Sequence, residues 1–290
     1  MSASPELLEA PGLSPGGLAR FCKYITGELG IKMSPAKLPM LQSRLRRRLR
    51  ALGLSSLDEY QSYLFDSAQG GEERVHFINA ITTNKTDFFR EPQHFAYLIE
   101  TGLPGLDPSR EAGAAELPWR LKLWCAGCSS GEEAYTLAMV LSEFGGSRTG
   151  FAFSLLATDI STRVLEHAQL GIYDEERLEP VPPALRAKYL LRSKDRARNQ
   201  VRIIPELRHK IAFRRLNFMD ANYPVKDRFE LIFFRNVMIY FDKPTQAEVI
   251  RKLCCHLVPG GYLFVGHSES LAGLKLPVQC IAPAVYRKPS

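Results

Sequence analysis

Long apolar runs are absent from this chain of 290 residues. A membrane-spanning helix needs about 18 or more consecutive apolar residues, and no stretch approaches that length. The first residues, Met-Ser-Ala-Ser-Pro-Glu, also lack the basic and apolar blocks of a secretory signal peptide. We therefore expect a cytoplasmic protein that does not insert into a membrane.

Cysteine is sparse, and its spacing does not complete a metal site. Of the six cysteines, Cys125 and Cys128 form a C-x-x-C pair, but no second cysteine pair or histidine pair accompanies them. A structural zinc site requires four ligands. The sequence therefore predicts no metal, and in a cytoplasmic protein all six cysteines should be free thiols.

Acidic residues are scarce in the N-terminal part of the chain. The whole chain carries a net charge of +7, and most of this positive charge lies in that part. Residues 16–64 contain nine Lys or Arg and three Asp or Glu, and five arginines fall between Arg44 and Arg50. Leucines recur along the same segment at helical spacing, at Leu38, Leu41, Leu45, Leu49 and Leu52. The arginines then lie on the opposite face, as either a solvated basic surface or a binding surface for an acidic partner. Composition alone allows nucleic acid, anionic lipid or a glutamate-rich protein as that partner.

The pattern beyond residue 118 alternates between strands and helices, which predicts a doubly wound α/β sheet. Residues 1–15 should be disordered, 16–83 helical with one helix at 72–82, and 102–118 a loop. Predicted strands are 121–126, 152–158, 229–234 and 261–266, with helices at 132–144, 161–169 and 244–257 and a final antiparallel strand within 277–287. The proline-containing stretch 171–213 interrupts this rhythm, and we expect a small inserted subdomain in which 200–205 pairs with 210–214.

The turn after the first predicted strand indicates a nucleoside pocket. Gly127 and Gly131 allow a sharp turn and close approach of a ligand. Glu132 and Glu133 in the first turn of the next helix would repel a pyrophosphate. The third glycine of a dinucleotide fingerprint is also absent, which weakens a nicotinamide or flavin interpretation. A ligand that is cationic and rich in hydroxyls fits better, and S-adenosylmethionine is both.

Polar residues follow other predicted strands at the same sheet edge. Asp159, at the end of the second strand, is placed to accept hydrogen bonds from both ribose hydroxyls, although alone it would be a turn former. Arg235 and Asn236 follow the strand 229–234 without the proline typical of enzymes that methylate bases. Before the sheet, the run from Thr82 to Glu91 should end the preceding helix, either as a capping linker or with Arg90 pointing into the pocket.

These segments together resemble the CheR-type chemoreceptor glutamate methyltransferases. The resemblance runs from about residue 18 to the C-terminus and is carried by residues 44–50, 81–91, 128–135, 157–160, 234–242 and 266–270. It implies a Rossmann-like S-adenosylmethionine-dependent methyltransferase domain at 119–290 with an inserted antiparallel β-subdomain at about 171–213. It also implies a small all-α receptor-recognition domain at 16–83 and a linker at 84–118 that contributes to the cofactor site.

The resemblance also implies roles for individual residues. It implies S-adenosylmethionine contacts, with S-adenosylhomocysteine as product, at Asn84, Thr86, Arg90, Glu133, Asp159, Asn217, Phe218, Asn236 and Val237. It implies that Arg90 and Tyr240 lie nearest the transferring methyl. The expected partner is the acidic cytoplasmic helices of a chemoreceptor, in membrane receptor arrays, bound through Arg44, Arg46, Arg47, Arg48 and Arg50. We expect a monomer that binds no nucleic acid.

One departure from the family pattern concerns receptor tethering. Some members hold a peptide at the receptor C-terminus through a glycine-rich loop of the β-subdomain, but residues 192–202 contain no glycine and are basic. This difference argues against such a tether. Two alternatives remain open: a methyltransferase acting on RNA or a small acid, and a catalytically silent adenosyl-binding module of a signalling scaffold.

Overall fold

The computed structural model describes residues 14–109, 117–146, 148–195 and 197–290. The chain divides into two compact units, Met1–Thr83 and Asn84–Ser290. The disordered tail was predicted at residues 1–15, of which 1–13 lie outside the described residues. Ser14 caps the first helix by accepting a hydrogen bond from Gly17 N at 3.1 Å, and Pro15 begins that helix, so the prediction is wrong for these two residues. No helix in the described part of the chain combines the length and apolar character needed to cross a membrane.

The first unit is helical, as predicted. Its helices are α1 (Pro15–Leu29), α2 (Leu38–Leu52), α3 (Leu57–Asp66) and α4 (Gly70–Ile81), with a short 3-10 turn at Pro35–Lys37. On α2 the leucine stripe faces the core, with Leu41, Leu45 and Leu49 buried. Gly53 adopts a left-handed φ of 68° and ends this helix, because a residue without a Cβ accepts that conformation readily.

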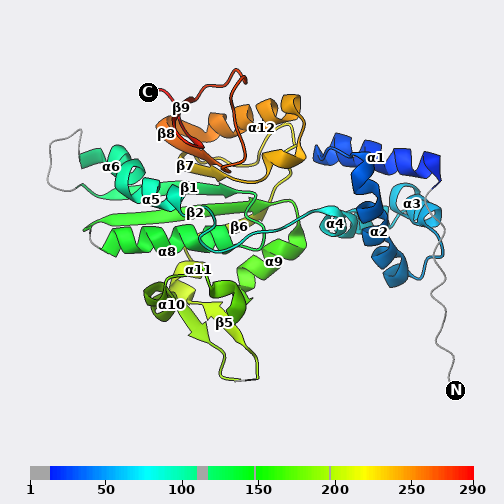
Figure 1. Cartoon of the computed structure of the whole chain (residues 1–290), viewed down its shortest axis with the longest axis horizontal. Helices are drawn as coiled ribbons and strands as arrows, with labels where there is room; N and C mark the ends of the chain where they lie inside the picture. Colours follow the sequence, from blue (N-terminus) through cyan, green and yellow to red (C-terminus); the bar gives the residue numbers. More distant parts are fainter. Residues whose placement is uncertain (1–13, 110–116, 147, 196) are drawn as a thin grey trace. The chain divides into compact units, whose positions relative to one another are not determined.

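The second unit is built on a seven-stranded sheet in the order β6-β2-β1-β7-β8-β10-β9 (Figure 1). The strands are β1 (Trp119–Ala126), β2 (Phe151–Asp159), β6 (Ile211–Arg215), β7 (Phe229–Phe234), β8 (Leu257–Val265), β9 (Gln279–Ala282) and β10 (Val285–Arg287). Neighbours from β6 to β8 pair in parallel, and β10 pairs antiparallel with β8 and β9. The predicted α/β architecture is confirmed, and the predicted C-terminal strand forms two short strands.

Helices cover both faces of the sheet, and successive side chains of a strand point alternately to one face and to the other. On β1, Leu121, Leu123 and Cys125 pack with helix α8 (Glu132–Gly146), whereas Trp124 packs with α12 (Lys243–His256) on the other face. Helix α9 (Thr162–Leu170) follows β2. Apolar residues line both faces of β7, of β8 and of the C-terminal halves of β1 and β2, so these strands are buried where they approach their carboxyl ends, whereas β6 at the sheet edge is largely exposed.

One strand assignment from the sequence is wrong. Residues 210–214 were expected to pair with 200–205, but β6 joins the main sheet in parallel with β2, with Ile211 opposite Leu155. The inserted subdomain has its own three-stranded sheet, β3 (Ile172–Asp174), β5 (Gln200–Ile203) and β4 (Leu190–Arg192), with α10 (Pro183–Tyr189) and α11 (Pro205–Arg208). A short apolar run indicates a strand but not its partner, because neighbouring segments compete for the same edge.

The predicted loop at 102–118 begins later than expected. Helical structure continues through α5 (Gln93–Tyr97), a π-helical turn (Leu98–Gly102) and α6 (Leu103–Leu106), and residues 110–116 lie outside the described residues. Leu103 is buried in the core beside α8, and Pro104 lies in the first turn of α6. Proline and glycine favour a loop in sequence, but a proline is tolerated in the first helical turn.

Candidate active site

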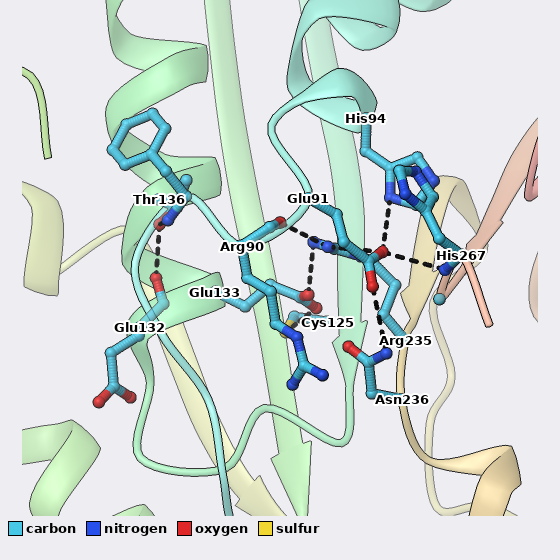
Figure 2. Close-up of polar contacts among 12 residues, drawn as sticks. Arg90, Glu91, His94, Cys125, Glu132, Glu133, Thr136, Arg235, Asn236 and His267 are labelled. Carbon is cyan, nitrogen blue, oxygen red and sulfur yellow. Dashed lines mark hydrogen bonds and ion pairs between the residues drawn. The ribbon is translucent and has the colours of Figure 1, made fainter. Parts of the chain in front are cut away.

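The carboxyl ends of the parallel strands bring the predicted site residues to one edge of the sheet. β1 leads into the turn at Gly127, β2 ends at Asp159, β7 leads to Arg235 and β8 leads to Gly266. In an open α/β sheet this edge is where ligands bind, because the connections diverge there and leave a crevice. Figure 2 shows side chains from the end of β1, the start of α8 and the turns after β7 and β8 converging with the loop before α5.

Arg235 is the central group of this edge. Its Nη1 lies 2.9 Å from Glu133 Oε2, and its Nη2 lies 3.0 Å from Glu91 Oε2. The same Nη2 donates to the main-chain carbonyl of Arg90. The Arg235 side chain is 0% exposed, so one fully buried guanidinium joins its own turn after β7 to α8 and to the loop before α5 (Figure 2). The planar donor fork of arginine makes this bridging possible.

The two adjacent glutamates of α8 have different partners. Glu132 is 0% exposed, pairs with Arg177 of the inserted subdomain at 2.7 Å and accepts a hydrogen bond from Ser130 Oγ at 2.7 Å. Burial raises its pKa, against the opposing effect of these partners. Glu133 is only half-buried and, besides Arg235, accepts a hydrogen bond from Cys125 Sγ at 3.2 Å. Glu132 is thus committed to the fold, whereas Glu133 is held at the sheet edge by Arg235 and remains partly accessible.

Asp159 ties together the turns after β1 and β2. Its Oδ2 accepts a hydrogen bond from Ser129 N at 2.9 Å, and its Oδ1 accepts one from Ser161 N at 3.0 Å. The residue is 8% exposed, and burial raises its pKa above the ordinary aspartate value. Each carboxylate oxygen can accept a second hydrogen bond, so Asp159 retains capacity for ligand hydroxyls.

Several non-glycine residues at this edge have left-handed backbone conformations. Phe89, Glu91, Ser129 and Asn236 have φ values of 52°, 56°, 49° and 60°. Such conformations cost free energy and persist only where the surroundings enforce them, which is typical of functional sites. Gly127 is equally constrained, since its φ is 85° and a Cβ there would lie 2.4 Å from Val237 Cγ2.

Glu269 fixes the conformation of Asn236. Its Oε2 accepts hydrogen bonds from Asn236 N at 2.8 Å and from Gly266 N at 2.7 Å, so the turns after β7 and β8 share one buried carboxylate. Burial raises its pKa, although these backbone donors oppose the shift. Asn236 Nδ2 in turn donates to Glu91 Oε1 at 3.3 Å. Asn236 therefore connects Glu269 to Arg235 and its partners Glu91 and Glu133, which together form the Arg235 cluster.

Residues 84–90 contact the sheet edge through their main chain. Ser129 Oγ donates to the carbonyl of Asn84 at 3.0 Å, and Arg177 Nη2 donates to the carbonyl of Thr86 at 2.7 Å. Thr86 is buried, whereas Asn84 and Arg90 are half-buried. Arg90 Nη1 donates to the Lys85 carbonyl at 3.2 Å, and its guanidinium points away from Arg235 in Figure 2. The linker therefore supplies backbone to the cluster and leaves the Arg90 guanidinium on the crevice side.

The remaining predicted residues follow β6 and β7 at the same edge. Asn217 Oδ1 accepts a hydrogen bond from Met219 N at 3.1 Å, and the Phe218 ring lies 5.0 Å from that of Phe234. Phe218 is 7% exposed, so it serves mainly as core packing. Val237 and Tyr240 are half-buried, Tyr240 within a 3-10 turn at Met238–Tyr240.

Four further site residues were not among the predicted ones: Glu91, His94, His267 and Glu269. Glu91 pairs with Arg235, so its pKa is lowered even though burial alone would raise it. His94 on α5 is 1% exposed, and burial together with Arg235 lowers its pKa to about 3, which leaves its imidazole neutral. Their place in the sequence could have indicated these residues. Glu91 follows Arg90 directly and His94 follows shortly after it, and the other two lie in the 266–270 segment that carried part of the resemblance.

The arginines of α2 separate into fixed and exposed groups. Arg48 forms a two-pronged ion pair with buried Glu73, with Nε–Oε1 at 2.9 Å and Nη2–Oε2 at 2.7 Å, and Tyr60 OH donates to the same carboxylate. Arg44 donates to the Ile81 carbonyl at the end of α4 at 2.6 Å. Arg47 and Arg50 are exposed, and Arg46 is half-buried. The run thus has a compensating acid that the sequence did not reveal, and part of it stabilises the helical unit.

The chemistry of this edge fits a hydroxyl-rich cation rather than a phosphate. Asp159 and Glu133 place carboxylates on two sides of the crevice, while the start of α8 carries two acids where a phosphate would need bare N–H groups. The absence of a Cβ at Gly127 allows the β1 turn to lie in close contact with Val237. Residues of these types are those that would hold S-adenosylmethionine.

Comparisons with known proteins assign both units. A family model described as "CheR methyltransferase, SAM binding domain" matches residues 84–286, and one described as "CheR methyltransferase, all-alpha domain" matches residues 17–82. A chemotaxis protein methyltransferase of Borreliella burgdorferi is 39% identical, over 93% of this chain and 93% of that protein. Those of Klebsiella aerogenes and Escherichia coli are 36% and 37% identical, over 98% and 97% of this chain and 93% of each relative.

Proposed function

The chain belongs to the CheR methyltransferase family, and from that premise we propose that it methylates glutamate side chains on the cytoplasmic domain of chemoreceptors. It is an S-adenosylmethionine-dependent methyltransferase of chemotaxis. The glutamate substrate is supported by the turn after β7, because Arg235 and Asn236 lack the proline typical of enzymes that methylate the amino groups of bases. The single observation that carries the proposal is that Asp159, Glu133 and Asn236 lie at one edge of the sheet, within the residues 84–286 that match the SAM-binding family model.

The reaction needs alignment more than acid–base catalysis. When bound, S-adenosylmethionine supplies an electrophilic methyl group on a positively charged sulfur. A glutamate carboxylate has an ordinary pKa of about 4.3 and is already ionised at neutral pH, so it needs no general base. The new bond joins a carboxylate oxygen to the methyl carbon, the sulfur–carbon bond breaks, and S-adenosylhomocysteine leaves. Opposite charges disappear in this step, so exclusion of water from the crevice favours it.

The described residues divide this work between binding and orientation. Asp159 is positioned for the ribose hydroxyls, and Glu133, held by Arg235, supplies negative charge near the sulfonium and amino groups. Tyr240 is our candidate to orient the acceptor carboxylate, since its hydroxyl can donate a hydrogen bond without the full charge that would blunt the nucleophile. Arg90 shapes the pocket beside it.

The proposal is tested with purified protein, S-adenosylmethionine labelled with tritium in its methyl group, and membranes that contain chemoreceptors. Label should enter the receptor band and be released as methanol by mild alkali, because methyl esters hydrolyse there and N-methyl groups do not. Alkali-stable label on RNA or protein would reject glutamate esterification. Binding of S-adenosylhomocysteine without any transfer would instead indicate a catalytically silent module.

Replacing Tyr240 with phenylalanine should lower kcat about 10- to 100-fold while the affinity for S-adenosylhomocysteine holds. The change removes one hydroxyl whose hydrogen bond to the acceptor aligns the reacting oxygen, and such alignment is worth a few kcal/mol. Single-turnover rates and calorimetric binding of S-adenosylhomocysteine separate the two effects. Tyr97→Phe on α5, which removes a hydroxyl away from the crevice, is the matched control. A loss of product affinity with an unchanged rate would contradict the role given to Tyr240.

Reversing the exposed charges of α2, with Arg47→Glu and Arg50→Glu together, should weaken receptor methylation about tenfold at low salt. Arg48 is left intact because an acid at that position would face buried Glu73. Exposed ion pairs contribute up to about 1 kcal/mol each and are screened by salt, so the difference should shrink at high ionic strength. The control is Lys243→Glu with Arg251→Glu on α12, which makes the same change in net charge. Equal rates for both double variants at low salt would remove α2 as a receptor-binding surface.

A further inference from the structure

Glu91, a partner of Arg235, also meets the side chains of His94 and His267, two histidines that the methyl transfer does not use. One donor atom from each lies within 4.8 Å of the other two. His94 Nδ1 is 3.5 Å from Glu91 Oε2, and the two imidazole rings have centroids 4.4 Å apart at 74° (Figure 2). Two imidazoles and one carboxylate are a ligand set that binds zinc and similar divalent ions.

The buried and unpartnered imidazole of His94 is the observation that indicates a ligand. It is 1% exposed, yet neither of its ring nitrogens has a hydrogen-bond partner among the described residues. A buried polar group without a partner costs about 1–3 kcal/mol, so a fold retains it only where something else compensates. The Phe264 ring packs against the His94 ring, with the two ring centroids 5.6 Å apart, and the carboxylate of Glu91 lies beside Nδ1.

The backbone holds the three residues together, and the surface gives access to them. His94 N donates to the Glu91 carbonyl at 3.1 Å, and His267 N donates to Glu91 Oε2 at 3.1 Å. His267 is exposed, so an ion can enter from solvent. Ligand atoms around zinc are about 3.4 Å apart, and the turn after β8 that carries His267 needs only a small movement to reach that spacing.

The charge balance around the cluster permits a cation. Arg235 is adjacent and positive, but it lies between Glu91 and Glu133, so these groups together carry a net negative charge. We propose that Glu91, His94 and His267 form a binding site for one divalent transition-metal ion of the zinc type, and that the bound ion competes with Arg235 for Glu91. The site goes beyond the proposed methyl transfer. Since Arg235 also holds Glu133, occupancy should weaken cofactor binding.

Cobalt(II) is a suitable probe because its visible absorption reports the coordinating atoms. Titration of the tag-free, full-length protein should show one equivalent bound with a visible band of nitrogen and oxygen ligation. His267→Ala and Glu91→Gln should each weaken binding at least about tenfold, while His209→Ala, an exposed histidine of the inserted subdomain, should match the native protein. His267 is chosen over buried His94 because its replacement leaves the core intact. No band, a thiolate charge-transfer band, or equal binding by His267→Ala would overturn the site.

The competition is measured separately, by calorimetric binding of S-adenosylhomocysteine with and without cobalt. The affinity should fall several-fold in the native protein and stay unchanged in His267→Ala. An unchanged affinity in the native protein would overturn the competition with Arg235. Because neither titration involves a receptor or methyl transfer, failure of the substrate proposal would leave both results readable.

Discussion

Replacing Arg235 with methionine should destabilise the sheet unit by about 3–5 kcal/mol and abolish high-affinity binding of S-adenosylhomocysteine. The guanidinium is fully buried, and its removal leaves Glu91 and Glu133 with their charges unpaired in a poorly solvated setting. It also frees the main-chain carbonyl of Arg90, which no longer holds the linker against the sheet. Urea unfolding followed by tryptophan fluorescence reports this unit selectively, because both tryptophans, Trp119 and Trp124, lie in β1.

Two companion variants separate charge from geometry. Arg235→Lys keeps the positive charge but cannot bridge two carboxylates and a carbonyl at once, so it should recover part of the stability and little of the binding. Arg251→Met, at an exposed position on α12, should change the free energy of unfolding by no more than about 0.5 kcal/mol. A loss below about 1 kcal/mol for Arg235→Met would show that the cluster is not a determinant of this edge.

Sequence patterns were sufficient for the four central strands of the sheet and for which loops meet at its carboxyl edge. Apolar runs of strand length, separated by helices, predicted β1, β2, β7 and β8, and the carboxyl-end rule then predicted which loops meet. Those loops indeed bring Glu133, Asp159 and Asn236 to one edge. The rule works because parallel strands all end on the same side, whatever the details of their side chains.

Ion pairs and strand pairs between residues far apart in the sequence could not be predicted in this way. Glu133 and Arg235 are 102 residues apart, and Arg48 and Glu73 are 25 apart, so no local pattern connects them. For the same reason the basic run on α2 looked uncompensated, and β6 was assigned to the wrong sheet. Charge and strand propensity are local properties, whereas partners are chosen by the three-dimensional fold.

Replacing Asp159 with asparagine should raise the dissociation constant of S-adenosylhomocysteine about 10- to 100-fold. Each carboxylate oxygen now accepts a backbone N–H, from Ser129 and from Ser161. An asparagine amide must present its NH₂ to one of these donors, and it loses the charged acceptor for a ribose hydroxyl. Hydrogen bonds to charged groups contribute about 1.5–3 kcal/mol, which corresponds to the expected range.

The dependence of this affinity on pH distinguishes Asp159 from the other buried acids. Burial raises the pKa of Asp159, so on acidification the native protein should begin to lose product affinity at a higher pH than an ordinary aspartate would impose. The asparagine variant cannot titrate at this position, so its affinity should lack that part of the decline while keeping the contributions of Glu132 and Glu269, whose pKa values are also raised. Calorimetry across the acidic range, within the pH limits where circular dichroism shows both proteins folded, measures the difference. Parallel curves for the two proteins would mean that the Asp159 carboxylate holds the two turns together without contacting the nucleoside.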